Sequence, residues 1–247
     1  LEFRDVSFRY PNAKEDELEH ISFKVGRGQT LAVIGATGSG KTTLVGLIPR
    51  FYDATDGEVL IDGVNVKDYT FDALYDRLGY VTQKAVLFSG DIKGNVLFGE
   101  SRGGREDSDV SHALTLAKAD EFVNKLSDGL ASPVAEGGSN FSGGQKQRLS
   151  IARALAREPE ILVFDDSFSA LDYRTDAALR AGLKSDLADT TKIIVAQRIG
   201  TIRNADKIIV LDDGKAVGIG THDELMRSCP VYQEIARSQL SSEELGA

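Results

Sequence analysis

The chain has 247 residues, which allows one large domain or two small ones with ample core. Its 41% hydrophobic and 27% charged residues are typical of a globular protein, and a formal net charge of −9 without a dense basic stretch argues against nucleic acid as the main partner. The only cysteine, Cys229, excludes an intrachain disulfide and favours a reducing compartment, and no apolar run approaches the roughly 20 residues that span a bilayer. Because the chain opens at Leu1 without a methionine and enters a strand pattern almost at once, we expect it to be part of a longer polypeptide.

The first elements in chain order are strands in which apolar and polar residues alternate. Residues 1–10, 21–25 and 57–61 have this pattern, which predicts half-buried strands that form an antiparallel patch. Between them, the apolar run 30–34 predicts a buried strand, and residues 43–48 predict the start of a helix.

The turn between that strand and that helix carries a phosphate-binding pattern. Residues 35–42 have the sequence Gly-Ala-Thr-Gly-Ser-Gly-Lys-Thr and match every fixed position of G-x-x-x-x-G-K-[ST]. Backbone N–H groups of such a loop close around phosphate oxygens, Lys41 adds a charge for the β and γ phosphates, and Thr42 offers a hydroxyl to Mg²⁺. A simple glycine-rich turn is the alternative. The predicted phosphate-binding residues are Gly35, Thr37, Gly38, Ser39, Gly40, Lys41, Thr42 and Thr43.

The middle of the chain, from about residue 84 to residue 141, lacks strong strand runs. A polar loop over 100–109 followed by a helical pattern over 110–126 predicts a helical insertion. After the insertion, helical stretches alternate with fully apolar runs, and this alternation is typical of a mainly parallel sheet. The predicted fold class is therefore α/β: a phosphate-loop NTPase core with a mainly parallel sheet, a flanking antiparallel β subdomain and a helical insertion. The later apolar runs are 161–164, 193–196 and 208–211, and the helical stretches between them are 148–157 and 174–187.

Two further motifs follow the insertion. The strand Ile-Leu-Val-Phe-Asp-Asp at 161–166 ends in two carboxylates, and in phosphate-loop NTPases such a strand delivers an aspartate, here Asp165, that supports Mg²⁺. Residues 140–148 place Ser142, Gly143 and Gly144 at a helix N-terminus, which can bind an anion. Taken alone, the first motif is a common strand ending and the second is a helix-capping turn.

Together with the phosphate loop, these motifs strongly resemble the ATP-binding cassette family, the nucleotide-binding domains of ABC transporters. The resemblance covers nearly the whole chain and follows exporter-type cassettes most closely over 191–225. It implies one cassette domain over 1–247, with an ATPase core at about 1–83 and 149–247. A helical subdomain at about 84–148 would carry the signature motif.

The resemblance also implies roles for other residues. Tyr10 falls where the family stacks an aromatic ring on adenine, and Gln83 matches the glutamine that reaches Mg²⁺ and the attacking water. The signature residues would contact ATP held by a partner; they are Phe141, Ser142, Gly143, Gly144 and Gln145. The implied metal ligands are Thr42, Gln83 and Asp165. The cofactors would be ATP and Mg²⁺. The partners would be a second cassette in a head-to-tail dimer and the transmembrane domains of an exporter, at the cytoplasmic face of the cell membrane.

Two positions depart from the family pattern. The usual general base is a glutamate, but this chain has Asp166, whose carboxylate is withdrawn by about one bond length. The switch histidine is replaced by Gln197, which can donate a hydrogen bond but cannot become cationic. With Gln83, these are the predicted catalytic residues. The three histidines lie elsewhere and are interpreted as surface or structural residues: His20, His112 and His222.

Both departures affect the site on this chain's own phosphate loop, whereas the signature motif is nearly intact, with Phe141 in place of the usual leucine. We therefore predict the degenerate-site half of a heterodimeric ABC exporter, with weak hydrolysis in isolation. The alternatives are a homodimeric exporter ATPase domain, a non-hydrolysing regulatory module, and a soluble ABC-type ATPase of DNA repair or translation.

Overall fold

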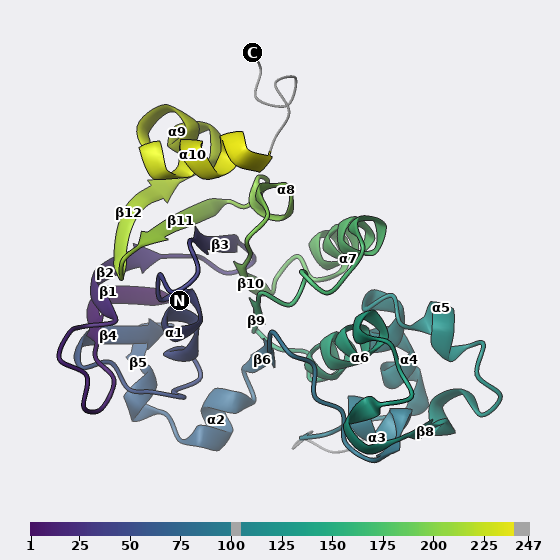
Figure 1. Cartoon of the computed structure of the whole chain (residues 1–247). Helices are drawn as coiled ribbons and strands as arrows, with labels where there is room; N and C mark the ends of the chain where they lie inside the picture. Colours follow the sequence, from purple (N-terminus) through teal and green to yellow (C-terminus); the bar gives the residue numbers. More distant parts are fainter. Residues whose placement is uncertain (100–104, 240–247) are drawn as a thin grey trace. The chain divides into compact units, whose positions relative to one another are not determined.

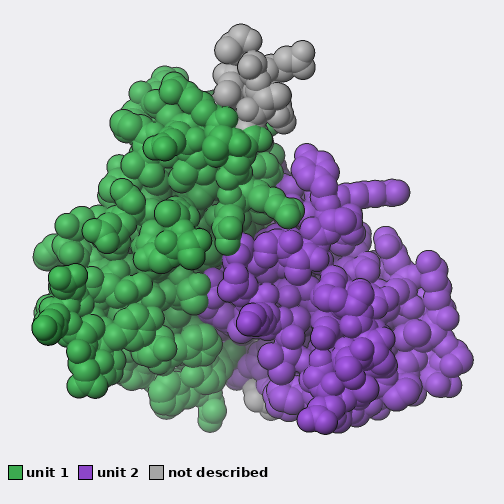
Figure 2. All heavy atoms as spheres, viewed as in Figure 1, with its two compact units in different colours: residues 1–75, 191–247 green, residues 76–190 purple. Residues whose placement is uncertain are grey.

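The computed structural model of the chain describes residues 1–99 and 105–239. The chain forms two compact units, one from residues 1–75 and from 191 onward, the other from residues 76–190 (Figure 2). The predicted subdomain boundaries near residues 84 and 148 stay a prediction. Among the described residues, we find no helix that combines the length and the apolar content of a membrane span.

The first unit contains a four-stranded antiparallel sheet with the strand order β2-β1-β4-β5 (Figure 1). The predicted antiparallel patch is therefore confirmed. Strand β1 deviates from strict alternation because Asp5 has a φ of 47° and the register shifts there, so that Val6, Ser7 and Phe8 are all buried. The strands are β1 (Glu2–Phe8), β2 (Leu18–Lys24), β4 (Asp56–Ile61) and β5 (Val64–Asn65).

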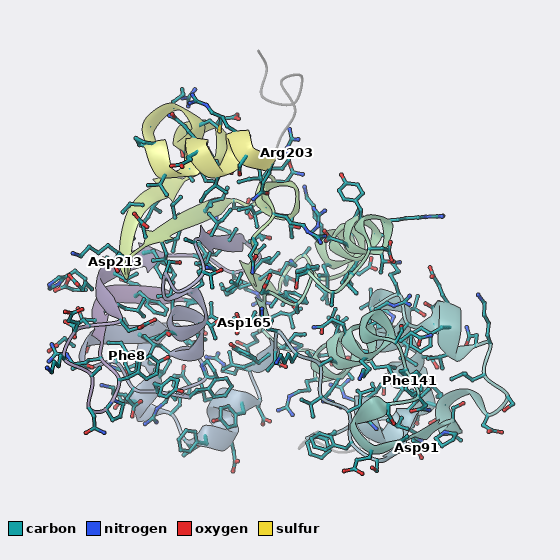
Figure 3. All side chains as sticks on the ribbon, in the orientation of Figure 1. Phe8, Asp91, Phe141, Asp165, Arg203 and Asp213 are labelled. Carbon is teal, nitrogen blue, oxygen red and sulfur yellow. The ribbon has the colours of Figure 1, made fainter. Side chains whose placement is uncertain are left out.

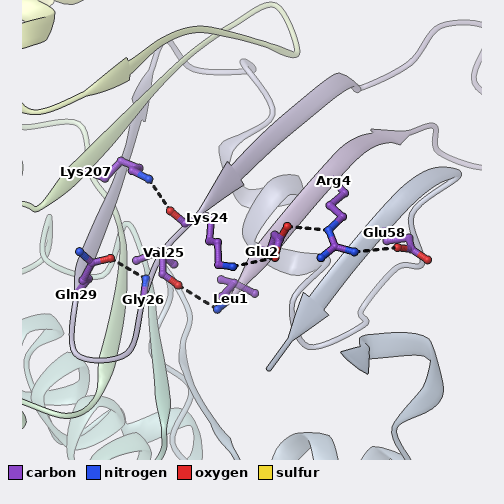
Figure 4. Close-up of polar contacts among 9 residues, drawn as sticks. All are labelled: Leu1, Glu2, Arg4, Lys24, Val25, Gly26, Gln29, Glu58 and Lys207. Carbon is purple, nitrogen blue, oxygen red and sulfur yellow. Dashed lines mark hydrogen bonds and ion pairs between the residues drawn. The ribbon is translucent and has the colours of Figure 1, made fainter. Parts of the chain in front are cut away.

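Charged side chains of three strands pair on this antiparallel sheet (Figure 4). The Glu2 carboxylate accepts a hydrogen bond from Arg4 Nε at 2.7 Å and lies 3.4 Å from Lys24 Nζ, while Arg4 also approaches Glu58 at 3.9 Å. Exposed ion pairs of this kind add little stability. The sheet is held mainly by its apolar face, where the rings of Phe3 and Phe23 stack with centroids 4.5 Å apart.

The same unit carries the strands that position the phosphate loop. Strand β3 pairs in parallel with both β10 and β11, and β12 is antiparallel to β11. The three parallel strands are buried along nearly their whole length, as expected for strands covered on both faces. The strands are β3 (Thr30–Gly35), β10 (Thr191–Val195), β11 (Lys207–Asp212) and β12 (Lys215–Gly220). The helices are α1 (Lys41–Gly46), 3₁₀-helix η1 (Val66–Asp68), α2 (Phe71–Tyr75), α8 (Ile199–Ile202), α9 (His222–Ser228) and α10 (Pro230–Gln239).

The second unit is mainly helical. Two strands pair in parallel, β6 (Leu78–Val81) and β9 (Ile161–Asp165), and the long helix α6 packs against α3, α4 and β6 (Figure 1). The helices are α3 (Ile92–Val96), α4 (Asp107–Leu116), α5 (Asp120–Val123), α6 (Gly143–Ala156) and α7 (Tyr173–Asp186). The short elements are β7 (Gly90–Asp91), β8 (Pro133–Val134), η2 (Gly129–Ala131) and η3 (Glu136–Gly138).

Two predicted boundaries are wrong because of helix caps. The predicted loop 100–109 lies partly outside the described residues, but Asp107 already begins α4, where Glu106 and Asp109 form a reciprocal capping box. Helix α6 begins at Gly143, five residues before the helical stretch predicted from 148 but in agreement with the predicted helix N-terminus at Ser142, Gly143 and Gly144, because Ser142 and Gln145 cap its first turn. A capping box satisfies backbone N–H groups that the helix leaves open, which offsets the low helix propensity of glycine.

Candidate functional site

The predicted phosphate loop leaves β3 and enters α1, and its tip, residues 36–38, is exposed. Two positions require glycine. A Cβ at Gly35 would collide with the carbonyl oxygen of Leu211 in β11. Gly40 has a φ of +93°, and a Cβ there would lie 2.8 Å from the Leu18 side chain. The glycines therefore set the close approach of the loop to the neighbouring strands.

Lys41 sits inside the curve of this loop. Its Nζ donates to the carbonyl oxygens of Gly35 at 2.8 Å and Ala36 at 2.6 Å, and to the Ser39 hydroxyl at 3.3 Å. A Cβ at Gly38 would meet no atom within 4 Å, so the loop is open on that side. A cation held within an open curve of backbone fits the β and γ phosphates of a nucleotide.

Tyr10 is linked directly to the helix that follows the loop. Its hydroxyl and the Thr43 hydroxyl lie 2.8 Å apart, within hydrogen-bond distance. The Tyr10 ring makes edge contacts with Phe8 and Tyr52, with centroids 4.8 and 5.1 Å away (Figure 3 labels Phe8). The structure thus brings two predicted site residues together, and the stacking of Tyr10 on adenine stays a prediction.

A cavity of about 370 Å³ opens beside the loop tip at Gly38. Four of its lining residues are acidic. Carboxylates accept hydrogen bonds and repel phosphate, so this cavity suits donors such as sugar hydroxyls. The lining residues are Ala13, Lys14, Glu15, Asp16, Glu17, Gly38, Asp213 and Gly214 (Figure 3 labels Asp213).

Gln197 leaves the sheet beside the phosphate loop. Val195 of β10 pairs with Val33 of β3, and the Ala196 N–H donates to the Val33 carbonyl at 3.2 Å. The carboxyl ends of parallel neighbours meet at one edge of a sheet, where ligands of α/β folds bind. Gln197 and Gly35 therefore emerge from adjacent strands at the same edge, and the Gln197 side chain is exposed.

In the second unit, β9 ends in the two predicted carboxylates. Asp165 and Asp166 are both buried, with 4% and 7% of their surface exposed (Figure 3 labels Asp165). The Tyr80 hydroxyl donates to Asp165 Oδ2 at 3.2 Å. Burial, followed by the charge of Asp165, raises the pKa of the Tyr80 phenol, so this hydroxyl remains a donor to the carboxylate.

Asp166 meets the predicted glutamine. The Gln83 Nε2 group donates to Asp166 Oδ2 at 3.0 Å. The Asp166 backbone has a φ of 48°, an uncommon value for a residue other than glycine, and its carbonyl accepts from the Ser169 hydroxyl at 2.7 Å. Two predicted catalytic residues are thus paired through their side chains.

The predicted signature motif begins α6. The Ser142 hydroxyl accepts from the Gln145 N–H at 3.3 Å, and Gln145 Oε1 accepts from the Ser142 N–H at 2.8 Å. A Cβ at Gly143 would meet nothing within 4 Å, so the described residues leave open space beside the positive end of this 14-residue helix. Phe141 is 8% exposed and packs on Phe122, so its side chain belongs to the core.

Two functional-site neighbours lie in α6 and were not predicted. The Gln147 side chain, 1% exposed, donates to the carbonyl of Thr82, next to Gln83. Arg153 donates to the carbonyls of Val86 at 2.9 Å and Asn95 at 2.8 Å. Gln147 could have been found as a polar residue on the buried stripe of the helix. The partners of Arg153 are remote in sequence, so no local signal marks it.

The predicted residues fall into two sets, one in each unit. Those of the first unit are Tyr10, the phosphate loop with Thr42 and Thr43, and Gln197; those of the second are Gln83, Asp165, Asp166 and the signature motif. The predicted magnesium ligands are divided between the units.

The parallel sheet, the glycine-lysine loop and the strand ending in carboxylates define a nucleotide-binding domain of the phosphate-loop class. A family profile described as "ABC transporter" matches residues 18–169, a range that contains the glycine-lysine loop, the strand ending in carboxylates and the signature motif. The chain therefore belongs to the ABC transporter family and is an ATP-binding domain of it.

Several relatives show the same similarity over nearly the whole chain. An uncharacterized ABC transporter ATP-binding protein of Mycobacterium tuberculosis is 48% identical over 245 residues, 98% of this chain and 41% of the relative. An ATP-dependent lipid A-core flippase of Albidiferax ferrireducens is 41% identical over 237 residues, 96% of this chain and 41% of the relative. The chain thus spans about two fifths of the length of these curated relatives.

A solved structure confirms the fold class. It is described as a bacterial Atm1-family ABC exporter with ATP bound. The match has a TM-score of 0.91 and 37% sequence identity, and it covers 97% of the present chain and 42% of the exporter chain. This domain therefore has homologues of the exporter type.

Proposed function

We propose that this chain is the nucleotide-binding domain of a heterodimeric ABC exporter at the cytoplasmic face of the cell membrane. It binds Mg-ATP at its own degenerate site, pairs head to tail with a non-identical cassette, and completes the hydrolytic site of that partner. ATP-driven closure and reopening of the dimer then act on attached transmembrane domains and power substrate export.

The pairing of Asp166 with Gln83 is the observation that carries the proposal of slow hydrolysis at this chain's own site. A general base must come within about 2.6–3.2 Å of the attacking water. Asp166 is one methylene shorter than glutamate, and its carboxylate already accepts the Gln83 amide at 3.0 Å. The shorter side chain places this carboxylate farther from a water on the γ-phosphate, and the hydrogen bond from Gln83 holds it in that position.

The residues that bind nucleotide are retained. Lys41 meets the β and γ phosphates, and Thr42, Gln83 and Asp165 would hold Mg²⁺. The bound ion neutralises charge on the phosphate oxygens. The acceptor-rich cavity beside Gly38 supports a ribose on that side of the loop. The site therefore binds Mg-ATP but hydrolyses it slowly.

The signature motif serves the other site of the dimer. Ser142 and Gln145 cap the first turn of α6, and there is open space beside Gly143. The N–H groups of Gly143 and Gly144 are therefore available to an anion. In the head-to-tail dimer this anion is the γ-phosphate held by the partner's phosphate loop.

A homodimeric exporter domain is the second candidate function. It is favoured by the fact that one chain carries both a phosphate loop and a complete helix cap, so that two copies could complete each other's sites. In that case Asp166 and Gln197 would have to support turnover by themselves.

Two substitutions in the assembled exporter test which site each residue serves. Ser142→Arg places a bulky cation at the α6 N-terminus, and we expect it to nearly eliminate steady-state ATP turnover. Asp166→Asn should change turnover little, because that carboxylate contributes weakly. Ser185→Arg, on the exposed side of α7, is the matched control. If Asp166→Asn is the crippling change and Ser142→Arg the mild one, the assignment is reversed; if both cripple turnover, the homodimeric function holds.

A further inference from the structure

The last described residue of α10 holds the loop that follows β10. Gln239 Nε2 donates to the carbonyl oxygen of Gln197 at 2.8 Å, and Gln239 Oε1 accepts from the N–H of Ile199 at 2.8 Å. One side-chain amide therefore bonds the backbone on both sides of Arg198.

The packing of helix α10 fixes the position of the Gln239 backbone. Tyr232 and Ala236, seven and three residues before Gln239, are both fully buried, and residues at this spacing share one face of a helix. The Tyr232 hydroxyl lies 2.8 Å from His222 Nδ1, and α10 packs on α8 and β11. The Gln239 side chain thus extends from the packed face of the helix.

One of the two hydrogen bonds satisfies a backbone N–H that the following helix cannot satisfy within itself. Arg198 is the N-cap of α8, and its side chain makes no capping bond. The Ile199 N–H is the first in a helix of only four residues, and such N-terminal N–H groups have no partner within their own helix. Gln239 supplies the missing cap from a different helix.

We propose that Gln239 is a positioning residue for Gln197. By fixing the backbone around Arg198, it keeps the Gln197 side chain directed at the γ-phosphate on this chain's own phosphate loop. The inference rests on the proposed function, in which Gln197 donates to that phosphate. Since ADP lacks a γ-phosphate, Gln239 contributes to the affinity for ATP and not to the affinity for ADP.

The test compares nucleotide affinities of the chain by calorimetry, with Mg²⁺ and either a non-hydrolysable ATP analogue or ADP. Gln239→Met keeps the length of the side chain and removes both hydrogen bonds. We expect affinity for the ATP analogue to fall about tenfold, the effect of one hydrogen bond to a charged group, with affinity for ADP unchanged. Gln233→Met, on the same helix, is the matched control and should change neither affinity.

A second background separates positioning from general destabilisation. In Gln197→Ala, which itself lowers the preference for the ATP analogue, Gln239→Met should cause no further loss, because the two residues act in series. Equal losses for ATP analogue and ADP, or a full additional loss in the Gln197→Ala background, would overturn the role of Gln239. If Gln197→Ala leaves the preference unchanged, the proposed role of Gln197 fails, and the positioning role fails with it. If Gln197→Ala lowers the preference and Gln239→Met does not, only the positioning role fails.

Discussion

At the scale of single residues, the proposed degenerate site rests on two positions, Asp166 and Gln197. Asp166 is buried and shares its carboxylate with Gln83, while Gln197 is exposed at the edge of the sheet where β3 and β10 end. Each departs from the family pattern in a different way: one loses reach and the other loses the ability to carry a proton.

Restoring the family residues should raise hydrolysis at this site. In Asp166→Glu with Gln197→His, the base regains its reach and the switch position regains an imidazole. General acid–base help is worth about 10²–10⁴-fold, so the gain should be clear in the rate. The double substitution should exceed the sum of the single effects if both act on one transition state. The measurement is the ATPase rate of an assembly in which this site closes on a partner signature. An unchanged rate would show that the site is idle for another reason.

At the scale of elements, helix α6 links the signature motif to the segment after β6. Its first turn carries Ser142, Gln147 bonds the carbonyl before Gln83, and Arg153 bonds the carbonyls of Val86 and Asn95. The Asn95 side chain in turn donates to the carbonyls of Phe88 and Asp91. Residues 82–95 are therefore tied to the helix through polar contacts of two of its residues, Gln147 and Arg153.

Arg153 should be the most sensitive of these contacts for stability. Burial lowers the pKa of its guanidinium, which remains charged, and the side chain also lies over the rings of Phe88 and Phe98. Arg153→Met keeps the stem but leaves the Val86 and Asn95 carbonyls without this donor. We expect the free energy of unfolding to fall by about 2 kcal/mol in urea denaturation. Arg227→Met, on an exposed turn of α9, is the control and should cost far less. Equal small losses in both variants would show that the Arg153 contacts contribute little.

At the scale of the whole molecule, the predicted site residues are divided between the two units. The phosphate loop, Tyr10 and Gln197 belong to the first unit, and the carboxylates, Gln83 and the signature motif belong to the second. In the proposed function, a partner cassette meets this chain in two places. Its bound nucleotide contacts the exposed first turn of α6, and its signature motif contacts the nucleotide bound to this chain.

The isolated chain should therefore bind Mg-ATP and hydrolyse it slowly. Lys41→Ala should abolish binding, because Lys41 is the cation inside the phosphate loop, whereas Lys184→Ala on an exposed face of α7 should leave binding intact. Equilibrium binding and steady-state turnover of the purified chain check both expectations. Turnover as fast as that of standard exporter domains would contradict the degenerate site.

Much of the fold could be predicted because its signals are local. The apolar runs of β3, β9, β10 and β11 and the alternation in β1 mark strands within a few residues. Ser142 marks a helix start and does cap α6. The start of α4 was missed, and the helical stretch predicted from 148 began too late, because reciprocal capping boxes extend a helix beyond what apolar periodicity shows.

The sequence by itself determined the phosphate loop, the signature motif and the two departures from the family pattern, because each is recognised from residues that are adjacent in the chain. Only the tertiary structure decided which side chains meet: Gln83 with Asp166 across 83 positions, Gln147 with Thr82 across 65, and Gln239 with Gln197 across 42. The physical reason is that a hydrogen bond needs its two groups within about 3 Å, and for residues so far apart in the chain that distance is set by the packing of strands and helices between them.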